Sequence, residues 1–154
     1  MESEIAAIYG GKVRVRACGF CRREAKLLLI NHKIGVNRDF WAPPGGGVEF
    51  GHSLASTVER EFKEETGLAI SVGNFLFGCE FIKNPLHAVE LFFEVRLLSG
   101  DLKVGKDPEL QIIKDARFMG QDEIDRINPE NLHGIFRVTR KISDLMSLKG
   151  FYTI

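Results

Sequence analysis

Three glutamates near the middle of the chain have the type and spacing to hold a divalent cation. Glu61, Glu64 and Glu65 stand at positions i, i+3 and i+4, so a helix would project their carboxylates from one side. Each like-charge pair at this spacing costs an isolated helix roughly 0.2–0.5 kcal/mol. Mg²⁺ suits such a cluster because it takes carboxylate, water and phosphate oxygens as ligands. A solvated acidic face is the alternative for any glutamate-rich helix, and the surrounding sequence must decide.

A helix over residues 53–66 is predicted to present these glutamates. Ser53 can act as its N-cap, and Gly67 can supply the left-handed turn that ends it. Its apolar stripe, at helical spacing, consists of Leu54, Ala55, Val58 and Phe62. The preceding residues 43–47 read Pro-Pro-Gly-Gly-Gly, which excludes regular structure there and predicts a loop of unusual backbone freedom.

Residues 46–68 resemble the 23-residue box of the Nudix hydrolase family. That box reads Gly, five residues, Glu, seven residues, then Arg-Glu-apolar-x-Glu-Glu-x-Gly-apolar. Eight of its nine specified positions match here, from Gly46 at the start to Leu68 at the end. The flanking Trp-Ala-Pro-Pro-Gly of residues 41–45 is similar to the family's usual surroundings. The resemblance implies one Nudix domain over residues 1–154 with an α/β fold, an α/β/α sandwich around a central mixed β-sheet.

The resemblance also implies a metal-dependent pyrophosphohydrolase. The ligands of its Mg²⁺ or Mn²⁺ would be Glu61, Glu64, Glu65 and the backbone carbonyl of Gly45. Glu61 or Glu65 could accept the proton of the attacking water, and Arg60 could orient a glutamate through a bidentate ion pair. Glu109 lies in a late segment from which some family members recruit a further acid as metal ligand or general base. A surface loop residue is the equal alternative for Glu109.

His52 departs from the pattern, because the family has its first box glutamate at this position. A neutral imidazole cannot supply a carboxylate's negative charge, and a protonated one would repel both a metal and Arg60. The three later glutamates are intact, which favours a working enzyme with a rebuilt network around Arg60. The alternatives are a general acid or base role for His52, and a Nudix-like module that binds a nucleotide without cleaving it.

Two arginines and an aromatic residue are candidates for substrate contact. Arg14 and Arg16 share one face of a predicted strand, where the Nudix fold commonly contacts nucleotide phosphates; a solvated outer face is the alternative. Trp41, with its neighbour Phe40, could stack on a base or pack in the core. The glycine loop adds two further substrate-binding candidates, Gly46 and Gly47.

The substrate is narrowed only to a nucleoside diphosphate-linked compound. ADP-ribose, nucleotide sugars and nucleoside triphosphates all fit the box. The ADP-ribose pyrophosphatases of the family tend to carry a proline slightly closer to the box than Pro85 lies here. This position therefore does not decide between the candidate substrates.

The remaining sequence predicts a mainly β scaffold around the helix. Alternation along residues 13–18 places Val13, Val15 and Ala17 on one face of a half-buried strand and Arg14, Arg16 and Cys18 on the other. Further strands are predicted at residues 27–30, 70–82, 88–98 and 116–119, with a turn at residues 84–85 between the middle two. A helical turn at residues 122–127 and a final helix over residues 134–147 complete the prediction.

Composition narrows the class of protein and its partners. The chain has 154 residues, of which 44% are apolar and 27% charged, as expected for one globular domain. Lys plus Arg equals Asp plus Glu at 21 each, so no bulk positive field would draw the chain to nucleic acid polymers or acidic membranes. The apolar runs of the chain, such as residues 27–30, are far shorter than the roughly 20 residues of a membrane helix.

The cysteines indicate a reducing compartment. Cys18, Cys21 and Cys79 are too few and too irregular for a disulfide framework, and without a secretory leader we expect the cytoplasm. Cys18 and Cys21 form a C-x-x-C motif, but the odd spacing sends their side chains to opposite faces of a strand, which disfavours a zinc or redox role. The expected partner is a small nucleotide diphosphate substrate, and the Nudix resemblance also allows a homodimer.

Overall fold

The computed structural model describes residues 2–33, 38–105 and 113–154. Its helices are α1 (Glu2–Tyr9), α2 (Leu54–Thr66), α3 (Gln121–Asp125) and α4 (Ile142–Leu145), with 3₁₀ turns η1 (Pro129–Asn131) and η2 (Gly134–Arg137). Its strands are β1 (Val13–Arg23), β2 (Lys26–His32), β3 (Trp41–Ala42), β4 (Gly45–Gly47), β5 (Ala69–Lys83), β6 (Leu86–Ser99), β7 (Ile113–Met119) and β8 (Phe151–Thr153). None of the helices in these ranges has the length and apolar character needed to cross a membrane.

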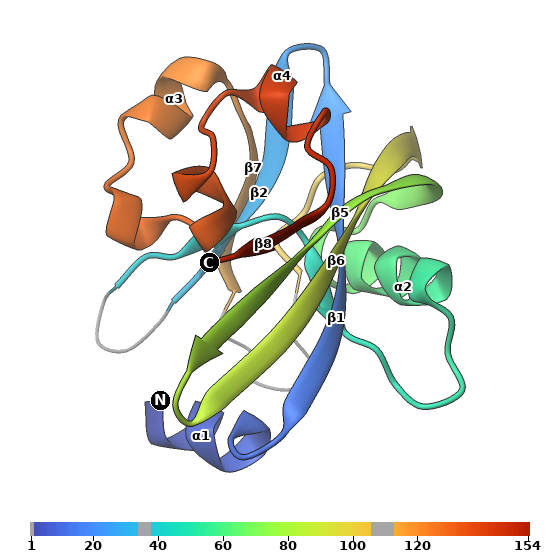
Figure 1. Cartoon of the computed structure of the whole chain (residues 1–154). Helices are drawn as coiled ribbons and strands as arrows, with labels where there is room; N and C mark the ends of the chain where they lie inside the picture. Colours follow the sequence, from blue (N-terminus) through green and yellow to red (C-terminus); the bar gives the residue numbers. More distant parts are fainter. Residues whose placement is uncertain (1, 34–37, 106–112) are drawn as a thin grey trace.

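The strands form one mixed sheet. They follow the order β3-β2-β1-β6-β5-β8, with β4 added beside β1 and β7 beside β2. β1 runs parallel to β6 and β5 runs parallel to β8, whereas β5 and β6 form a long antiparallel hairpin. Figure 1 shows α2 on one side of this sheet and α3 and α4 on the other. The predicted α/β/α sandwich with a central mixed sheet is therefore confirmed.

The sheet separates two hydrophobic clusters. On one face, Val58 and Phe62 of α2 pack with Cys21 and Val95. On the opposite face, residues from the C-terminal segments cover the stacked rings of Phe20, Phe77 and Phe92. The other large, fully buried side chains of this second cluster are Leu27, Leu29, Ile124, Leu132 and Ile135. Cys18 belongs to this second cluster and Cys21 to the first. The prediction that the two thiols point to opposite faces is confirmed.

The first half of β1 keeps the predicted alternation of faces, but its apolar face is not buried. Val13 and Val15 are 59% and 43% exposed, although the alternation placed them on the buried face. Arg16 lies on the opposite face and is held inward by a 2.6 Å ion pair with Glu90 of β6. The reason is that α2 covers only the later part of β1, so the apolar face of the earlier part stays uncovered.

The glycine run forms a strand, which corrects the prediction of irregular structure at residues 43–47. β4 pairs antiparallel with β1, with Gly45 opposite Cys18 and Gly47 opposite Arg16. A Cβ atom at Gly45 would lie 2.6 Å from both the Ala17 carbonyl oxygen and the Cys18 sulfur. Glycine here serves close approach of two backbones rather than flexibility.

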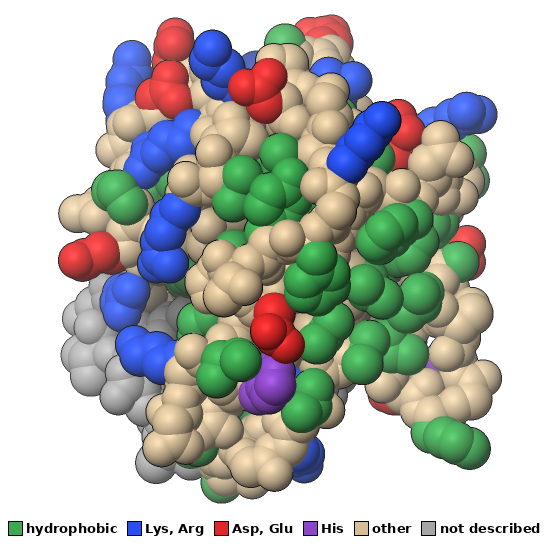
Figure 2. Space-filling model, in the orientation of Figure 1, with side chains coloured by type: hydrophobic (Ala, Val, Ile, Leu, Met, Phe, Trp, Pro, Cys, Tyr) green, Lys and Arg blue, Asp and Glu red, His purple; other side chains and the backbone are tan. Residues whose placement is uncertain are grey.

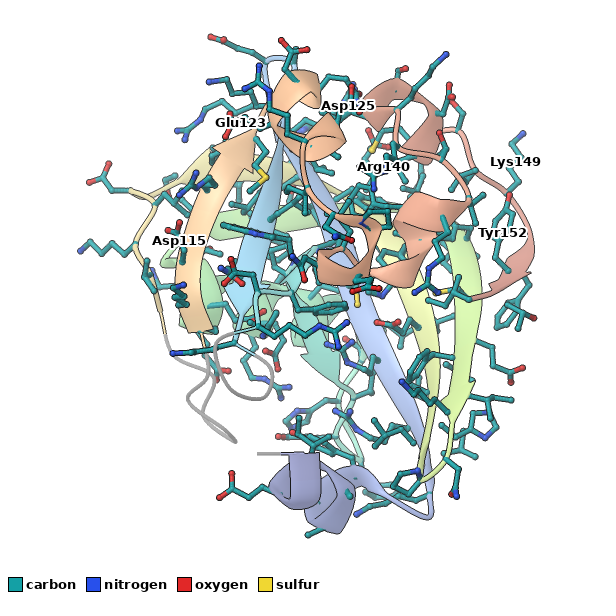
Figure 3. The ribbon with its side chains drawn as sticks, turned by 90° about the vertical axis from the view of Figure 1, so that its left-hand side faces the viewer. Asp115, Glu123, Asp125, Arg140, Lys149 and Tyr152 are labelled. Atoms are coloured by element: carbon teal, nitrogen blue, oxygen red, sulfur yellow. The ribbon has the colours of Figure 1, made fainter. Side chains whose placement is uncertain are left out.

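The final helix predicted over residues 134–147 is also corrected, because η2 and α4 are separate short elements. Between them, Arg140 turns toward the end of α3 and donates to the carbonyls of Ile124 and Ile127 at 3.1 and 3.0 Å. Figure 3 shows Arg140 between these C-terminal elements. Carbonyls at a helix end are available as acceptors. The hydrogen bonds of Arg140 to these carbonyls therefore compete with a continuous helix through residue 140.

Candidate active site

The ends of α2 lie where the sequence predicts them. Ser53 Oγ accepts a hydrogen bond from the Ser56 N–H at 3.0 Å. At the other end, Gly67 has a φ of +73°, and its N–H donates to the Lys63 carbonyl at 3.0 Å. Glycine takes this left-handed conformation without steric cost. The helix prediction over residues 53–66 is therefore confirmed, including both caps.

Burial of the apolar stripe decides which way the glutamates of α2 point. Val58 and Phe62 are fully buried, and a Cβ atom at Gly19 of β1 would lie 2.8 Å from the Phe62 ring. Burying such a side chain contributes about 1.5–3 kcal/mol, which outweighs the like-charge cost of the glutamates. Glu65 is carried to a position only 2% exposed.

Two of the three glutamates meet β4. The Gly45 N–H donates to Glu65 Oε1 at 3.0 Å. The Glu61 carboxylate lies against Gly46, where a Cβ atom would be 2.4 Å from its carboxyl carbon. The bare backbone of β4 thus forms a cradle for two carboxylates, and any larger residue at position 46 would fill it.

Arg60 connects this cradle to the loop before α2. Its Nη2 donates to Glu61 Oε1 at 3.2 Å and to the Gly47 carbonyl at 3.3 Å. Its Nη1 lies 3.2 Å from both Glu49 Oε2 and His52 Nδ1. Arg60 touches Glu61 through a single nitrogen, not through the bidentate pair expected from the sequence.

The electrostatics of the cluster suit a cation. Burial raises the pKa of Glu61 above its ordinary value, the Glu64 carboxylate raises it further, and Arg60 opposes both. The protein therefore neutralises only part of the negative charge that is concentrated here. The donor atoms are all carboxylate oxygens, which hard divalent cations prefer.

Within the described ranges, no three acidic, histidine or cysteine side chains are already gathered around a point that would hold a metal. The available ligands are the two carboxylates at the cradle and a third carboxylate, which lies one helical turn away on α2. This set fits Mg²⁺ or Mn²⁺, which complete their shell with water and substrate oxygens. Glu109, the further acid proposed from the sequence, lies outside the described residues.

Comparison with known proteins decides the family. The NUDIX domain model matches residues 12–138. The chain belongs to the Nudix family. An ADP-ribose pyrophosphatase of Methanocaldococcus jannaschii is 31% identical over 111 residues, which is 71% of this chain and 63% of that protein. YjhB of Bacillus subtilis (strain 168), provisionally named as an ADP-ribose pyrophosphatase, is 27% identical over 124 residues, 77% of this chain and 55% of its own length.

Among solved structures, the Nudix fold is matched by a MutT protein from Methanosarcina mazei Go1. The TM-score is 0.69 at 21% identity, with 86% of this chain and 93% of that chain covered. At this level of identity the similarity establishes a shared fold and nothing more. The chain spans less than two thirds of the length of the two relatives named above.

A buried polar network that the sequence reasoning missed adjoins the Nudix cradle. Glu90 accepts from Arg16 at 2.6 Å and from His133 Nε2 at 2.8 Å. Because His133 Nδ1 accepts from the Ile135 N–H at 3.1 Å, the ring proton of a neutral His133 must lie on Nε2. Burial alone would raise the pKa of Glu90, but the interactions with His133 and Arg16 lower it to about 2.

This network reaches the cradle through Arg16. A second nitrogen of its guanidinium lies 3.4 Å from the Gly45 carbonyl oxygen, the predicted backbone ligand of a metal. A carbonyl oxygen has two lone pairs, so this long contact leaves one for a cation. A glutamate in the middle of an apolar strand, such as Glu90, is the sequence signal that could have revealed the network, since buried carboxylates require partners.

The other predicted substrate residues are dispersed around the Nudix cradle. Arg14 lies over the ring of Tyr9, 3.6 Å from its centroid, and a Cβ atom at Gly47 would be 3.4 Å from the Arg14 guanidinium. Trp41 is only 8% exposed and packs in the core, which supports the packing alternative. Phe40 remains partly exposed beside the His133 ring, with centroids 6.3 Å apart.

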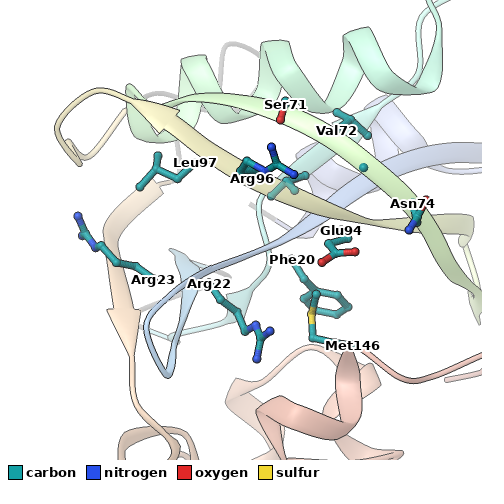
Figure 4. A pocket seen from close by; sticks show the side chains of 12 residues that line it. Phe20, Arg22, Arg23, Ser71, Val72, Asn74, Glu94, Arg96, Leu97 and Met146 are labelled. Atoms are coloured by element: carbon teal, nitrogen blue, oxygen red, sulfur yellow. The ribbon is translucent and has the colours of Figure 1, made fainter.

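A separate cavity lies away from the acidic helix. It measures about 650 Å³ and is lined by ends of β1, β5 and β6 together with Met146. Figure 4 shows Arg22, Glu94 and Met146 around it, with α2 on the far side of the sheet. No residue of the Nudix box lines this cavity, so the candidate site remains the region where β4, α2 and Arg16 meet.

Proposed function

We propose that this Nudix protein is a metal-dependent hydrolase that cleaves a diphosphate bond in a nucleoside diphosphate-linked substrate. The observation that carries the proposal is the cradle, in which β4 and α2 bring Glu61 and Glu65 together beside Glu64. Packing energy from the apolar stripe maintains this concentration of charge, which has no structural benefit of its own.

The proposed metal ligands are Glu61, Glu64, Glu65 and the Gly45 carbonyl. Mg²⁺ or Mn²⁺ bound there would supply neutralisation of the diphosphate oxygens and a water of lowered pKa. Glu61 and Glu65 are the two candidates for holding the proton of the attacking water. In the present arrangement Glu61 accepts a hydrogen bond from Arg60 and Glu65 accepts one from the Gly45 N–H.

Arg16 is the proposed contact for a substrate phosphate. Its side chain is 24% exposed while its inner edge is held by Glu90, so a pre-oriented guanidinium faces the site without having to be ordered on binding. The contact with Glu90 neutralises part of its charge, and the remaining N–H groups are directed to Gly45 and the site.

For the substrate class, we propose ADP-ribose first, with nucleotide sugars and nucleoside triphosphates as the other candidates. Support comes from the M. jannaschii relative, whose name is that of an ADP-ribose pyrophosphatase. The free, buried cysteines support the proposed cytoplasmic location, where thiols stay reduced.

The second candidate function is a nucleotide-binding module that no longer cleaves. The departure at His52 is the observation that favours it. Against it stand the three intact glutamates and the fact that Arg60 still has an anionic partner, Glu49, at 3.2 Å.

The test is a hydrolysis assay with Mg²⁺ or Mn²⁺ against ADP-ribose, nucleotide sugars, dinucleoside polyphosphates and nucleoside triphosphates. Glu64→Gln and Glu65→Gln are each expected to lower turnover by at least a hundredfold, and Glu59→Gln, an exposed glutamate of the same helix, serves as the control. Ligand binding without turnover, together with activity gained in His52→Glu, would instead establish the binding module.

We also propose that the chain forms a homodimer through an apolar sheet face, defined by Val13, Val15, Phe75, Ile82, Leu91 and Phe151. Neighbouring strands carry these residues, and four of them are more than half exposed. Figure 2 shows hydrophobic side chains gathered over this part of the sheet. Exposed apolar patches of this kind mark interaction sites, and a two-fold dimer would bury the same patch on both copies.

A further inference from the structure

The loop before α2 folds back so that two of its side chains meet Arg60. The His52 N–H donates to the Glu49 carbonyl at 3.0 Å, and Gly51 between them has a φ of +84°, which favours glycine. The result is a tight turn with Glu49 and His52 side by side; their Oε2 and Nδ1 atoms are 3.4 Å apart.

His52 contributes no negative charge to this contact. Its Nδ1 lies 3.2 Å from Arg60 Nη1 and 3.4 Å from Glu49 Oε2, and an imidazole carries no negative charge in any protonation state of the ring near neutrality. The negative charge beside Nη1 comes instead from Glu49, whose Oε2 is 3.2 Å away.

The orientation of Arg60 matters for the carboxylate cradle. While Nη1 is held by Glu49 and His52, Nη2 is left to bind Glu61 and the Gly47 carbonyl. Because a guanidinium is planar and rigid, fixing one nitrogen fixes the direction of the other. Glu49 therefore helps to fix the position of Glu61 through the guanidinium of Arg60.

From these contacts we infer that Glu49 is a positioning residue of the proposed hydrolase. It supplies from three residues upstream the carboxylate that the box pattern has at position 52, and it holds Arg60 on Glu61. This inference rests on the proposed function for its catalytic consequence, but the effect on the metal site is separately measurable. Glu49 is 62% exposed, so the effect is that of an exposed ion pair, modest in size.

The experiment is a double-mutant cycle with two readouts, the dissociation constant of Mn²⁺ from the protein alone and kcat/KM for the best substrate. In the natural background, Glu49→Gln is expected to weaken Mn²⁺ binding about fivefold and to lower kcat/KM by a similar factor, acting mainly on kcat. In the His52→Glu background, where a carboxylate stands at position 52, the same change should cost less than twofold. Glu59→Gln is the control and should change neither readout.

The outcomes distinguish the positioning role of Glu49 from the proposed hydrolase function. Equal losses in both backgrounds would mean that Glu49 contacts the metal or substrate itself, and no loss in either would mean that Arg60 needs no carboxylate; both overturn the inference. A protein that binds Mn²⁺ with the expected coupling between positions 49 and 52, yet hydrolyses nothing, would uphold the positioning role and refute the hydrolase. Absence of Mn²⁺ binding in the unaltered protein would refute both.

Discussion

A methyl group at residue 46 would lie 2.4 Å from the carboxyl carbon of Glu61. Gly46→Ala is therefore expected to push this carboxylate out of the cradle. Because the displaced group is the end of a side chain, the melting temperature should fall by only a few degrees, while kcat falls at least tenfold. The measurement is a hydrolysis assay combined with thermal unfolding.

The matched control for this change is Gly120→Ala, since a Cβ atom at Gly120 meets no atom within 4 Å. Its turnover and melting temperature should stay near those of the unaltered protein. Turnover of Gly46→Ala within twofold of the natural chain would show that Glu61 does not need the cradle.

Glu90 is expected to make the free energy of unfolding depend on pH in the acid range. Its pKa is lowered to about 2 in the folded protein by His133 and Arg16, against an ordinary value near 4.5. The stabilisation is therefore complete above pH 4.5 and is lost as the pH falls toward 2. Glu90→Gln should lower the free energy of unfolding at pH 7 by about 3–5 kcal/mol, because Arg16 then lacks its buried partner.

The check is urea unfolding of Glu90→Gln and of Glu94→Gln across pH 2–7. Glu94, an exposed residue four positions along the same strand, is the control. The deficit of Glu90→Gln should shrink below pH 4.5, since Glu90 of the natural protein is then protonated in the unfolded chain while it stays ionised in the folded protein down to about pH 2. A deficit independent of pH would mean that the carboxylate charge is not what stabilises the fold.

The three thiols are expected to be unreactive in the folded protein. Burial raises the pKa of Cys21 to about 11 and that of Cys79 to about 12, and burial also raises the pKa of Cys18. Only the thiolate reacts readily, so a thiol-specific reagent at pH 8 should label none of them in minutes. All three should react in denaturant, and rapid labelling of the native protein would contradict the assignment of Cys18 and Cys21 to separate clusters.

Ile82→Lys is expected to convert a homodimer into a monomer. Ile82 is 59% exposed on the apolar sheet face, and a lysine there would be desolvated in the dimer without a partner. Light scattering after size-exclusion chromatography measures the mass. Val138→Lys, at a 40% exposed valine of the C-terminal segments, is the control, and a natural chain that is monomeric at micromolar concentration would refute the proposed interface.

Local signals in the sequence were enough to predict α2. Its caps at Ser53 and Gly67 depend on neighbouring residues only, and so does its apolar stripe. The predicted strands at residues 27–30, 70–82, 88–98 and 116–119 all fall within observed strands for the same reason. The acidic cluster followed directly, since helix geometry fixes how i, i+3 and i+4 positions are related.

What could not be predicted depends on contacts between distant segments. β8 is three residues long and exists because it pairs with β5 some seventy positions earlier. β4 consists of glycines, which have a low strand propensity. It forms because its backbone pairs closely with β1, at a distance where a Cβ atom at Gly45 would clash. The N-terminal helix α1 was not predicted because it is only eight residues long, too short for its apolar periodicity to stand out, although Gly10 and Gly11 follow its last residue. The exposed Val13 likewise reflects where α2 ends above the sheet, and the inward Arg16 reflects its ion pair with Glu90 of β6.

The separation of the interior into two clusters has a consequence for how this protein can change. The acidic helix rests on one cluster, and the C-terminal turns rest on the other, with the sheet between them. A substitution at Leu145 or Ile124 loosens the second cluster while leaving the packing beneath Val58 and Phe62 intact. Segments beyond residue 120, apart from His133 and its contact with Glu90, can thus diverge in evolution or be exchanged by an engineer while the packing that holds the acidic helix is inherited unaltered.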